Sequence, residues 1–154
     1  MLIKLRYDSA AFVDVSSELL ASGYRVRFRA NGWSMRPAIC DGETVTVDPV
    51  RPSSVKKGDI LLLRQNGRPL VHRVVDIGVK NGTVVAFIVR GDAKRGCDAP
   101  VKPEDVLGRV SETRGAGGWR SIVQRWRSSR LPNASTPFAG STYDTQRVVE
   151  RQHG

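Results

Sequence analysis

The sequence has few of the residues on which covalent cross-links and metal sites depend. Its 154 residues include two cysteines and two histidines. Cys40 and Cys97 are too few for a disulfide framework, and they indicate two free thiols in a reducing compartment. Neither cysteine lies in a Cys-x-x-Cys pair or beside enough histidines for a zinc site. We therefore expect neither a metal nor a cofactor.

Long apolar runs are also missing. No stretch of about 18 apolar residues occurs, which predicts that no helix spans a membrane. The first residues, MLIKLRYDSAAF, lack the continuous apolar segment and the cleavage site of a secretory signal. A soluble, cytoplasmic protein is expected.

Acidic residues are outnumbered by basic ones. The chain has 25 Lys and Arg against 15 Asp and Glu, which gives a net charge of +10. Such an excess suits nucleic acid, an anionic membrane face, or simply a solvated surface. Because no nucleic-acid-binding motif accompanies the charge, no nucleic-acid partner is expected.

Short alternating segments separated by turns are what the sequence does contain. With 15 glycines and 8 prolines, it favours turns over long helices. One short helix is expected over Asp8–Gly23, where apolar residues recur at helical spacing. Period-two alternation and Asx-Gly turns then predict a mainly antiparallel β domain. Its strands are expected at Tyr24–Ala30, Thr44–Asp48, Asp59–Arg64, Leu70–Ile77 and Thr83–Arg90.

The chain changes character near its C-terminal third. Residues 1–111 are expected to form the β domain, and residues 112–118, which contain Arg-Gly-Ala-Gly-Gly, a flexible hinge. Residues 119–131 predict a basic amphipathic helix, and residues 132–154 a disordered tail. This helix either lies in the plane of an anionic membrane, at the inner face of the cell membrane, or packs on the domain. Its apolar face would consist of Trp119, Ile122, Val123 and Trp126.

Candidate chemistry begins at Ser34, in the stretch NGWSMRPAICDGETVTV. A nucleophilic serine needs a base within hydrogen-bond reach and an acid that orients the base. His72 is the credible base, because the other histidine, His153, falls in the expected tail. Asp92 and Asp98, in RGDAKRGCD, are the candidate acids. Taken singly, each has an ordinary interpretation as a turn residue or a structural strand histidine.

The order of these segments is more specific than any one of them. SMRP, DGETVTV, KKGDILLL, VHRVV, VRGDAKRGCD and VLGRV together resemble the type I signal peptidases over roughly Arg29 to Val110. The resemblance is strongest to the branch of archaea, some Gram-positive bacteria and the endoplasmic reticulum, in which a histidine replaces the lysine base. It implies a β-rich serine endopeptidase that cleaves an extended peptide or a preprotein segment. In it Ser34 would be the nucleophile, His72 the general base and Asp98 the orienting acid, with Asp92 supporting the same loop.

Three features near the nucleophile depart from or complete that pattern. The family usually has a serine at position 32, where it helps to hold the oxyanion, and here that position is Gly32. Trp33 stands where the family usually has glycine, so it is expected to narrow or line the substrate cleft. Met35 is expected to pack beneath Ser34, with backbone N–H groups around the serine as oxyanion donors. The membrane anchor typical of a signal peptidase is also missing from the sequence.

Two other functions stay open. The glycine at position 32 resembles the residue that the self-cleaving SOS-repressor proteases have there. Those proteases, however, have a lysine where this chain has His72. Only 33 residues precede Ser34, too few for a helix-turn-helix domain and a cleavage linker. A non-catalytic peptide-binding module on the same fold is the third interpretation. The presence of Ser34, His72 and both aspartates in one chain speaks against it.

Overall fold

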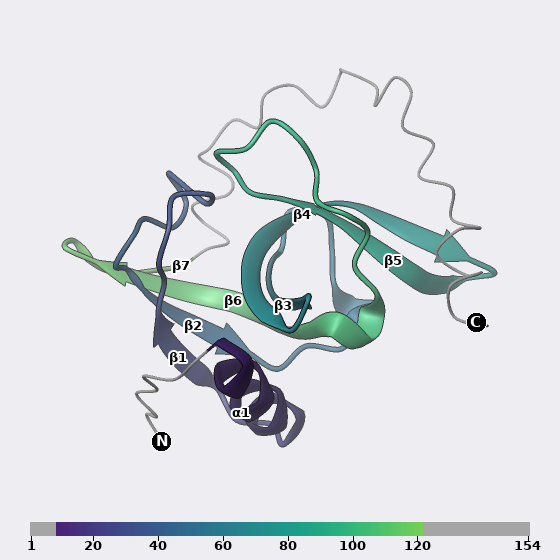
Figure 1. The fold of residues 1–154 in the computed structure, drawn as a ribbon, viewed down its shortest axis with the longest axis horizontal. Coiled ribbons are helices and arrows are strands. Elements are labelled where there is room, and N and C mark those ends of the chain that lie inside the picture. The colour runs from purple at the N-terminus through teal and green to yellow at the C-terminus, as the bar shows by residue number, and fades with distance from the viewer. Residues whose placement is uncertain (1–8, 122–154) are drawn as a thin grey trace.

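The fold is a strongly curved antiparallel sheet with one helix packed against it (Figure 1). The computed structural model describes residues 9–121. The predicted fold class, mainly antiparallel β with a short N-terminal helix, is confirmed. The helices are α1 (Ser9–Ala21), η1 (Pro52–Ser54) and η2 (Pro103–Asp105). The strands are β1 (Val26–Arg29), β2 (Thr44–Asp48), β3 (Ile60–Gln65), β4 (Arg68–Lys80), β5 (Thr83–Arg90), β6 (Val106–Gly115) and β7 (Gly118–Ser121).

Strand β6, which was not predicted from the sequence, lies within the sheet between predicted strands. The order is β1-β2-β6-β3-β4-β5, with β7 paired to the side of β6, and every pairing is antiparallel. Strand β6 runs between β2 and β3, although VLGRVSETRG has two glycines and no regular alternation. Tertiary pairing on both sides therefore overrides a weak local preference for a strand.

The apolar run of β3 is explained by its central place. Ile60 and Leu62 belong to the core under α1, whereas Leu61 and Leu63 belong to a second core on the opposite side. All four side chains are fully buried. Because alternate side chains of a strand point to opposite faces, a strand covered on both sides needs a continuous apolar run.

The turns follow the residue types that encode them. Asn66-Gly67 joins β3 to β4, and Asn81-Gly82 joins β4 to β5. Both residues of each pair have positive φ, between 51° and 75°. This is the backbone that a two-residue hairpin turn requires and that Asn-Gly adopts at low cost. The two turns expected from the sequence therefore set the register of the central hairpins.

The predicted hinge and helix differ from the structure. Residues 112–115 continue β6, and the chain then turns back at Ala116-Gly117 into β7. Gly118 has φ of 88°, so glycine here closes a hairpin instead of loosening a linker. Trp119 lies in this strand and not in a helix, with the Arg27 guanidinium 4.6 Å from its ring. The remaining residues of the predicted helix, among them Ile122, Val123 and Trp126, and the predicted tail lie outside the described residues.

Candidate active site

Ser34 lies in the loop that joins β1 to β2. The base of this loop is closed where the Ala30 N–H donates to the Glu43 carbonyl, at 2.9 Å. Met35 is 5% exposed and belongs to the core that also contains side chains of α1. Its neighbour Ser34 is half-buried. The buried methionine therefore anchors the loop while the serine stays at the surface.

The side chain of His72, on β4, is completely buried and lies between Ser34 and Asp98. Its Nε2 is 3.1 Å from the Ser34 hydroxyl oxygen, and its Nδ1 contacts a carboxylate oxygen of Asp98. The Asp98 N–H donates to the Val89 carbonyl at 2.9 Å, and this bond ties the backbone of Asp98 to the end of β5. A histidine that donates from Nδ1 to a carboxylate has its Nε2 free to accept the serine proton.

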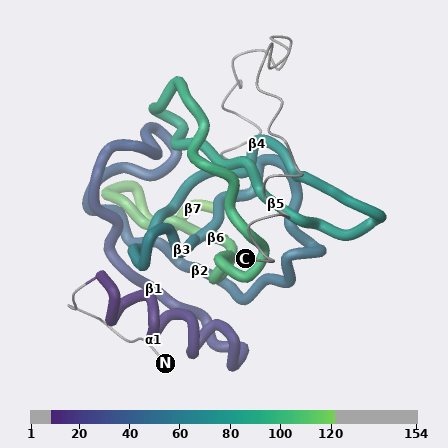
Figure 2. The backbone as a smooth tube through the Cα atoms, turned by 45° about the vertical axis from the view of Figure 1, so that its right-hand side comes forward, coloured from purple at the N-terminus to yellow at the C-terminus, as the bar shows by residue number. Residues whose placement is uncertain are grey.

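The loop after β5, residues 91–98, passes over the Ser34 loop, and Figure 2 shows both at the same end of the molecule. The Ala93 N–H donates to the Ser34 carbonyl at 2.9 Å. A Cβ atom added to Gly91 would lie 2.6 Å from that carbonyl oxygen and 3.0 Å from Nε2 of His72. Only glycine lets the loop approach this closely, because any side chain there would displace the serine or the histidine.

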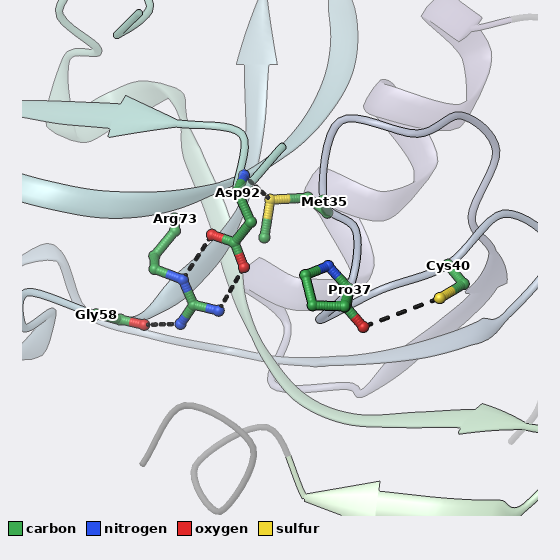
Figure 3. Close-up of polar contacts among 6 residues, drawn as sticks. All are labelled: Met35, Pro37, Cys40, Gly58, Arg73 and Asp92. Carbon is green, nitrogen blue, oxygen red and sulfur yellow. Dashed lines mark hydrogen bonds and ion pairs between the residues drawn. The ribbon is translucent and has the colours of Figure 1, made fainter. Parts of the chain in front are cut away.

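Asp92 makes no hydrogen bond to His72. It forms an ion pair with Arg73 instead (Figure 3). Both of its oxygens accept from the Arg73 guanidinium, each at 2.8 Å, and Arg73 also donates to the Gly58 carbonyl at 2.8 Å. The Arg73 side chain is only 3% exposed. The Asp92 N–H meets the Met35 sulfur at 3.4 Å, so this pair also reaches the Ser34 loop.

The two pairs hold the 91–98 loop from both sides of one strand. His72 and Arg73 are neighbours on β4, and neighbouring side chains of a strand point to opposite faces. Asp98 meets the first and Asp92 meets the second. The loop returns to β5 through the Asp98 N–H and the Val89 carbonyl, and each of its aspartates has a different partner on β4.

Burial lowers the pKa of His72 below its usual value, because the charged imidazolium loses its hydration. The hydrogen bond and the charge of Asp98 act in the opposite direction without reversing the shift. The nearby Lys94 ammonium lowers the pKa further. At neutral pH the imidazole is consequently neutral, which is the form that can accept a proton.

The residues expected near the oxyanion have distinct surroundings. Gly32 has φ of 101°, and its N–H donates to the Asp41 carboxylate at 2.8 Å. The backbone N–H of Ser34 donates to no acceptor within residues 9–121. Trp33 is 60% exposed, so it stands at the surface directly before the serine. The Arg36 guanidinium covers one side of its ring, 4.5 Å from the centroid.

Arg73 and Gly91 were missed in the sequence, although both stand beside residues that were selected there. Arg73 follows His72, and a basic residue on a buried stretch of strand needs an acidic partner. Gly91 precedes Asp92, but a glycine before an aspartate indicates a turn as readily as a close approach. Signals for both residues exist, yet neither identifies its partner.

Other parts of the described chain offer no competing centre. Within residues 9–121, no group of three or more His, Cys, Asp or Glu side chains is placed to hold a metal ion. Both cysteines have free thiols. A surface pocket of about 480 Å³ between α1 and the start of β6 contains none of the residues around Ser34. Ser17 lines this pocket, but no histidine that could activate it does, so we assign the chemistry to Ser34.

Comparisons with known proteins fit this geometry. The profile of the Peptidase S24-like family matches residues 4–85, more than half of the chain. The chain belongs to the Peptidase S24-like family. The matched range includes Ser34 and His72, whereas Asp92 and Asp98 lie beyond it.

The chain is also similar to a subunit of signal peptidase. It is 29% identical over 87 residues to the signal peptidase complex catalytic subunit SEC11C of Homo sapiens, Canis lupus familiaris and Mus musculus. The similarity covers 50% of this chain and 45% of each relative, so the chain spans about half the length of the curated relatives it matches. A signal-peptidase-like serine protease family, expected from the sequence, is confirmed.

Within residues 9–121, no helix has the length and apolar character needed to cross a bilayer.

Proposed function

We propose that this member of the Peptidase S24-like family is a serine endopeptidase that cleaves an extended peptide or preprotein segment. The observation that carries the proposal is the continuous chain of contacts from Ser34 through His72 to Asp98. A nucleophile, a base within 3.1 Å and a partly buried acid behind the base form the arrangement that acyl transfer requires.

The contacts assign one role to each side chain. His72 Nε2 takes the proton of the Ser34 hydroxyl while the serine oxygen attacks the peptide carbonyl carbon. When the tetrahedral intermediate collapses, the C–N bond breaks and His72 gives its proton to the departing amine. A water molecule, deprotonated by His72, then attacks the acyl ester, and its proton returns to the serine oxygen. Asp98 keeps the imidazole in the required tautomer and stabilises its charged form.

Negative charge on the substrate carbonyl needs a donor, and the Ser34 backbone N–H is the candidate. This N–H makes no bond within residues 9–121, whereas the Gly32 N–H is engaged by Asp41. Position 32 has no hydroxyl to add a second donor. We therefore expect oxyanion stabilisation to rest on backbone groups at Ser34 and the residues that follow it.

An edge strand beside the serine is suited to holding an extended substrate. Strand β1 leads into the Ser34 loop and, among residues 9–121, pairs only with β2. Its other edge offers backbone donors and acceptors to a peptide that adds as a further strand. This mode of binding needs a surface groove and no deep pocket.

The decisive experiment compares the intact protein with Ser34→Ala and His72→Ala on a peptide library, with cleavage read by mass spectrometry. We expect peptides to be cut in trans by the parent and by neither variant. A shortened chain that arises only in the parent would indicate self-processing, the second function considered from the sequence. No cleavage of peptides or of the chain itself would favour a peptide-binding module and reject the enzyme.

Cellular location and membrane contact stay predictions. We expect a cytoplasmic protein, with peripheral contact to the inner membrane face as an alternative. The sequence predicts this contact through Trp119, Ile122, Val123 and Trp126. The structure describes only Trp119 among them.

A further inference from the structure

An aromatic and a cationic side chain stand together at the surface beside Ser34. Trp33 precedes the serine and is 60% exposed, and the Arg36 guanidinium lies 4.5 Å from the centre of its ring. A guanidinium on an aromatic face keeps its in-plane N–H groups available, and these groups match the two oxygens of a carboxylate. The pair thus combines a flat apolar surface with an oriented fork of donors.

Arg36 has no acidic partner of its own. Its side chain is exposed, and its guanidinium makes no hydrogen bond or ion pair with any residue from 9 to 121. The carboxylates nearby are already engaged. Asp41 accepts from the Gly32 N–H, Asp92 is held by Arg73, and Asp98 is held by His72.

A second cation lies in the loop that bonds to the Ser34 backbone. Lys94 belongs to the 91–98 loop, which bonds to the Ser34 carbonyl through Ala93. Its side chain is half exposed, and its ammonium is 3.9 Å from one Asp98 oxygen, at the outer limit of an ion pair. Arg95, next in the loop, is also exposed. Both segments that border Ser34 therefore present positive charge to solvent.

We infer that the site recognises an acidic side chain close to the scissile bond, with Arg36 as the specificity-determining residue and Trp33 as its support. The inference rests on the proposed function, because it names the substrate class of the same site. A glutamate or aspartate bound here gains a two-pronged hydrogen bond from Arg36 and longer-range attraction from Lys94. The contact selects the substrate and takes no part in the bond-breaking step.

The test begins with the cleavage profile of the parent protein on an unbiased peptide library. Peptides are then made in matched sets that differ only by Glu, Gln or Lys at the position with the strongest acidic preference. Their C-termini are amidated, so that the side chain is the carboxylate under test. Arg36→Gln removes the charge, Arg36→Lys keeps it without the planar fork, and Lys80→Gln is the charge-matched control at the far end of β4.

We expect the parent to cleave the Glu peptide about fivefold more efficiently than the Gln peptide, mainly through a lower KM, and to cleave the Lys peptide least. Arg36→Gln should cleave the Glu and Gln peptides with equal efficiency, and Arg36→Lys should keep part of the preference. Added salt should reduce the preference of the parent. Lys80→Gln should behave as the parent.

Two results separate this inference from the proposed function. Cleavage without an acidic preference, or a preference that survives in Arg36→Gln, overturns the role of Arg36 and leaves the endopeptidase intact. Failure of the parent to cleave any peptide in the library overturns the proposed function, and this inference falls with it.

Discussion

His72 and Arg73 are adjacent on β4, and each is bound by an aspartate of the same loop, yet only one pair is suited to catalysis. The burial of the two pairs is nearly equal. The side chains of His72 and Asp98 are 0% and 15% exposed, and those of Arg73 and Asp92 are 3% and 16% exposed. Burial alone therefore does not distinguish a pair suited to catalysis from a structural one.

The difference lies in what each cation can do with a proton. A guanidinium stays charged at any pH a protein experiences, so Arg73 and Asp92 can only attract each other. An imidazole exchanges its proton near neutral pH, and Nε2 of His72 faces the Ser34 hydroxyl at 3.1 Å. Mutations on the two sides of β4 should therefore separate activity from stability.

The largest effect is expected from Asp98→Asn. The amide can no longer hold the tautomer in which Nε2 accepts the serine proton, so kcat/KM should fall by roughly a thousandfold or more. The fold should persist, because the amide fills the same space as the carboxylate. Peptide cleavage and a thermal unfolding curve measure the two effects. Activity within tenfold of the parent would contradict the orienting role.

Gly91→Ala should affect both activity and stability. The new Cβ atom would lie 2.6 Å from the Ser34 carbonyl oxygen and 3.1 Å from the Ser34 Cβ atom, so the serine and the loop must separate. We expect a loss of about 1–3 kcal/mol in unfolding free energy and a loss of activity on the order of a hundredfold. Gly96→Ala is the matched control, since a Cβ atom there meets no neighbour within 4 Å. Similar behaviour of the two variants would show that the close approach is unimportant.

Arg73→Met should act chiefly on stability. Removal of the guanidinium leaves the Asp92 carboxylate, only 16% exposed, without its partner, and should cost about 3 kcal/mol in urea unfolding. Adding Asp92→Asn should restore part of the loss by removing the unpaired charge. Lys57→Met is the control, because it breaks an exposed ion pair with Asp76, which lies on β4 as Arg73 does. It should change the free energy of unfolding by about 0.5 kcal/mol or less. Equal losses in the buried and exposed pairs would refute the comparison.

The smallest effect is a change in pH dependence. Because burial lowers the pKa of His72, activity should persist as the pH falls below about 6.5 and should disappear only through the lower pKa. In the same window the unfolded chain binds more protons than the folded one. The contribution of His72 to the free energy of unfolding therefore decreases as the pH falls. In Asp98→Asn the pKa should move lower still, because Asp98 raises it. NMR titration of the His72 ring in both proteins measures the shift.

Much of the fold could be predicted because its signals are local. The Asn-Gly pairs at 66–67 and 81–82 form the expected turns, and Thr44–Asp48 and Thr83–Arg90 have the expected bounds. The Gly-rich run at residues 112–118 was predicted as a flexible hinge, and this prediction is wrong, since glycine suits a tight hairpin as well as a linker. Only pairing with β6 determines that it forms a hairpin.

In the candidate site, too, some features could be predicted from the sequence and others depend on the tertiary structure. The residue types that the chemistry needs can be recognised in the sequence, in an order shared with a protease family, and this order selects Ser34 and His72. The residues alone left two aspartates, six positions apart in one loop, as candidate acids, and the resemblance favoured Asp98. The fold distinguishes them, because His72 and Arg73 are neighbours on β4 and alternate side chains of a strand face opposite sides. Asp98 consequently meets the imidazole on one side, and Asp92 meets the guanidinium on the other.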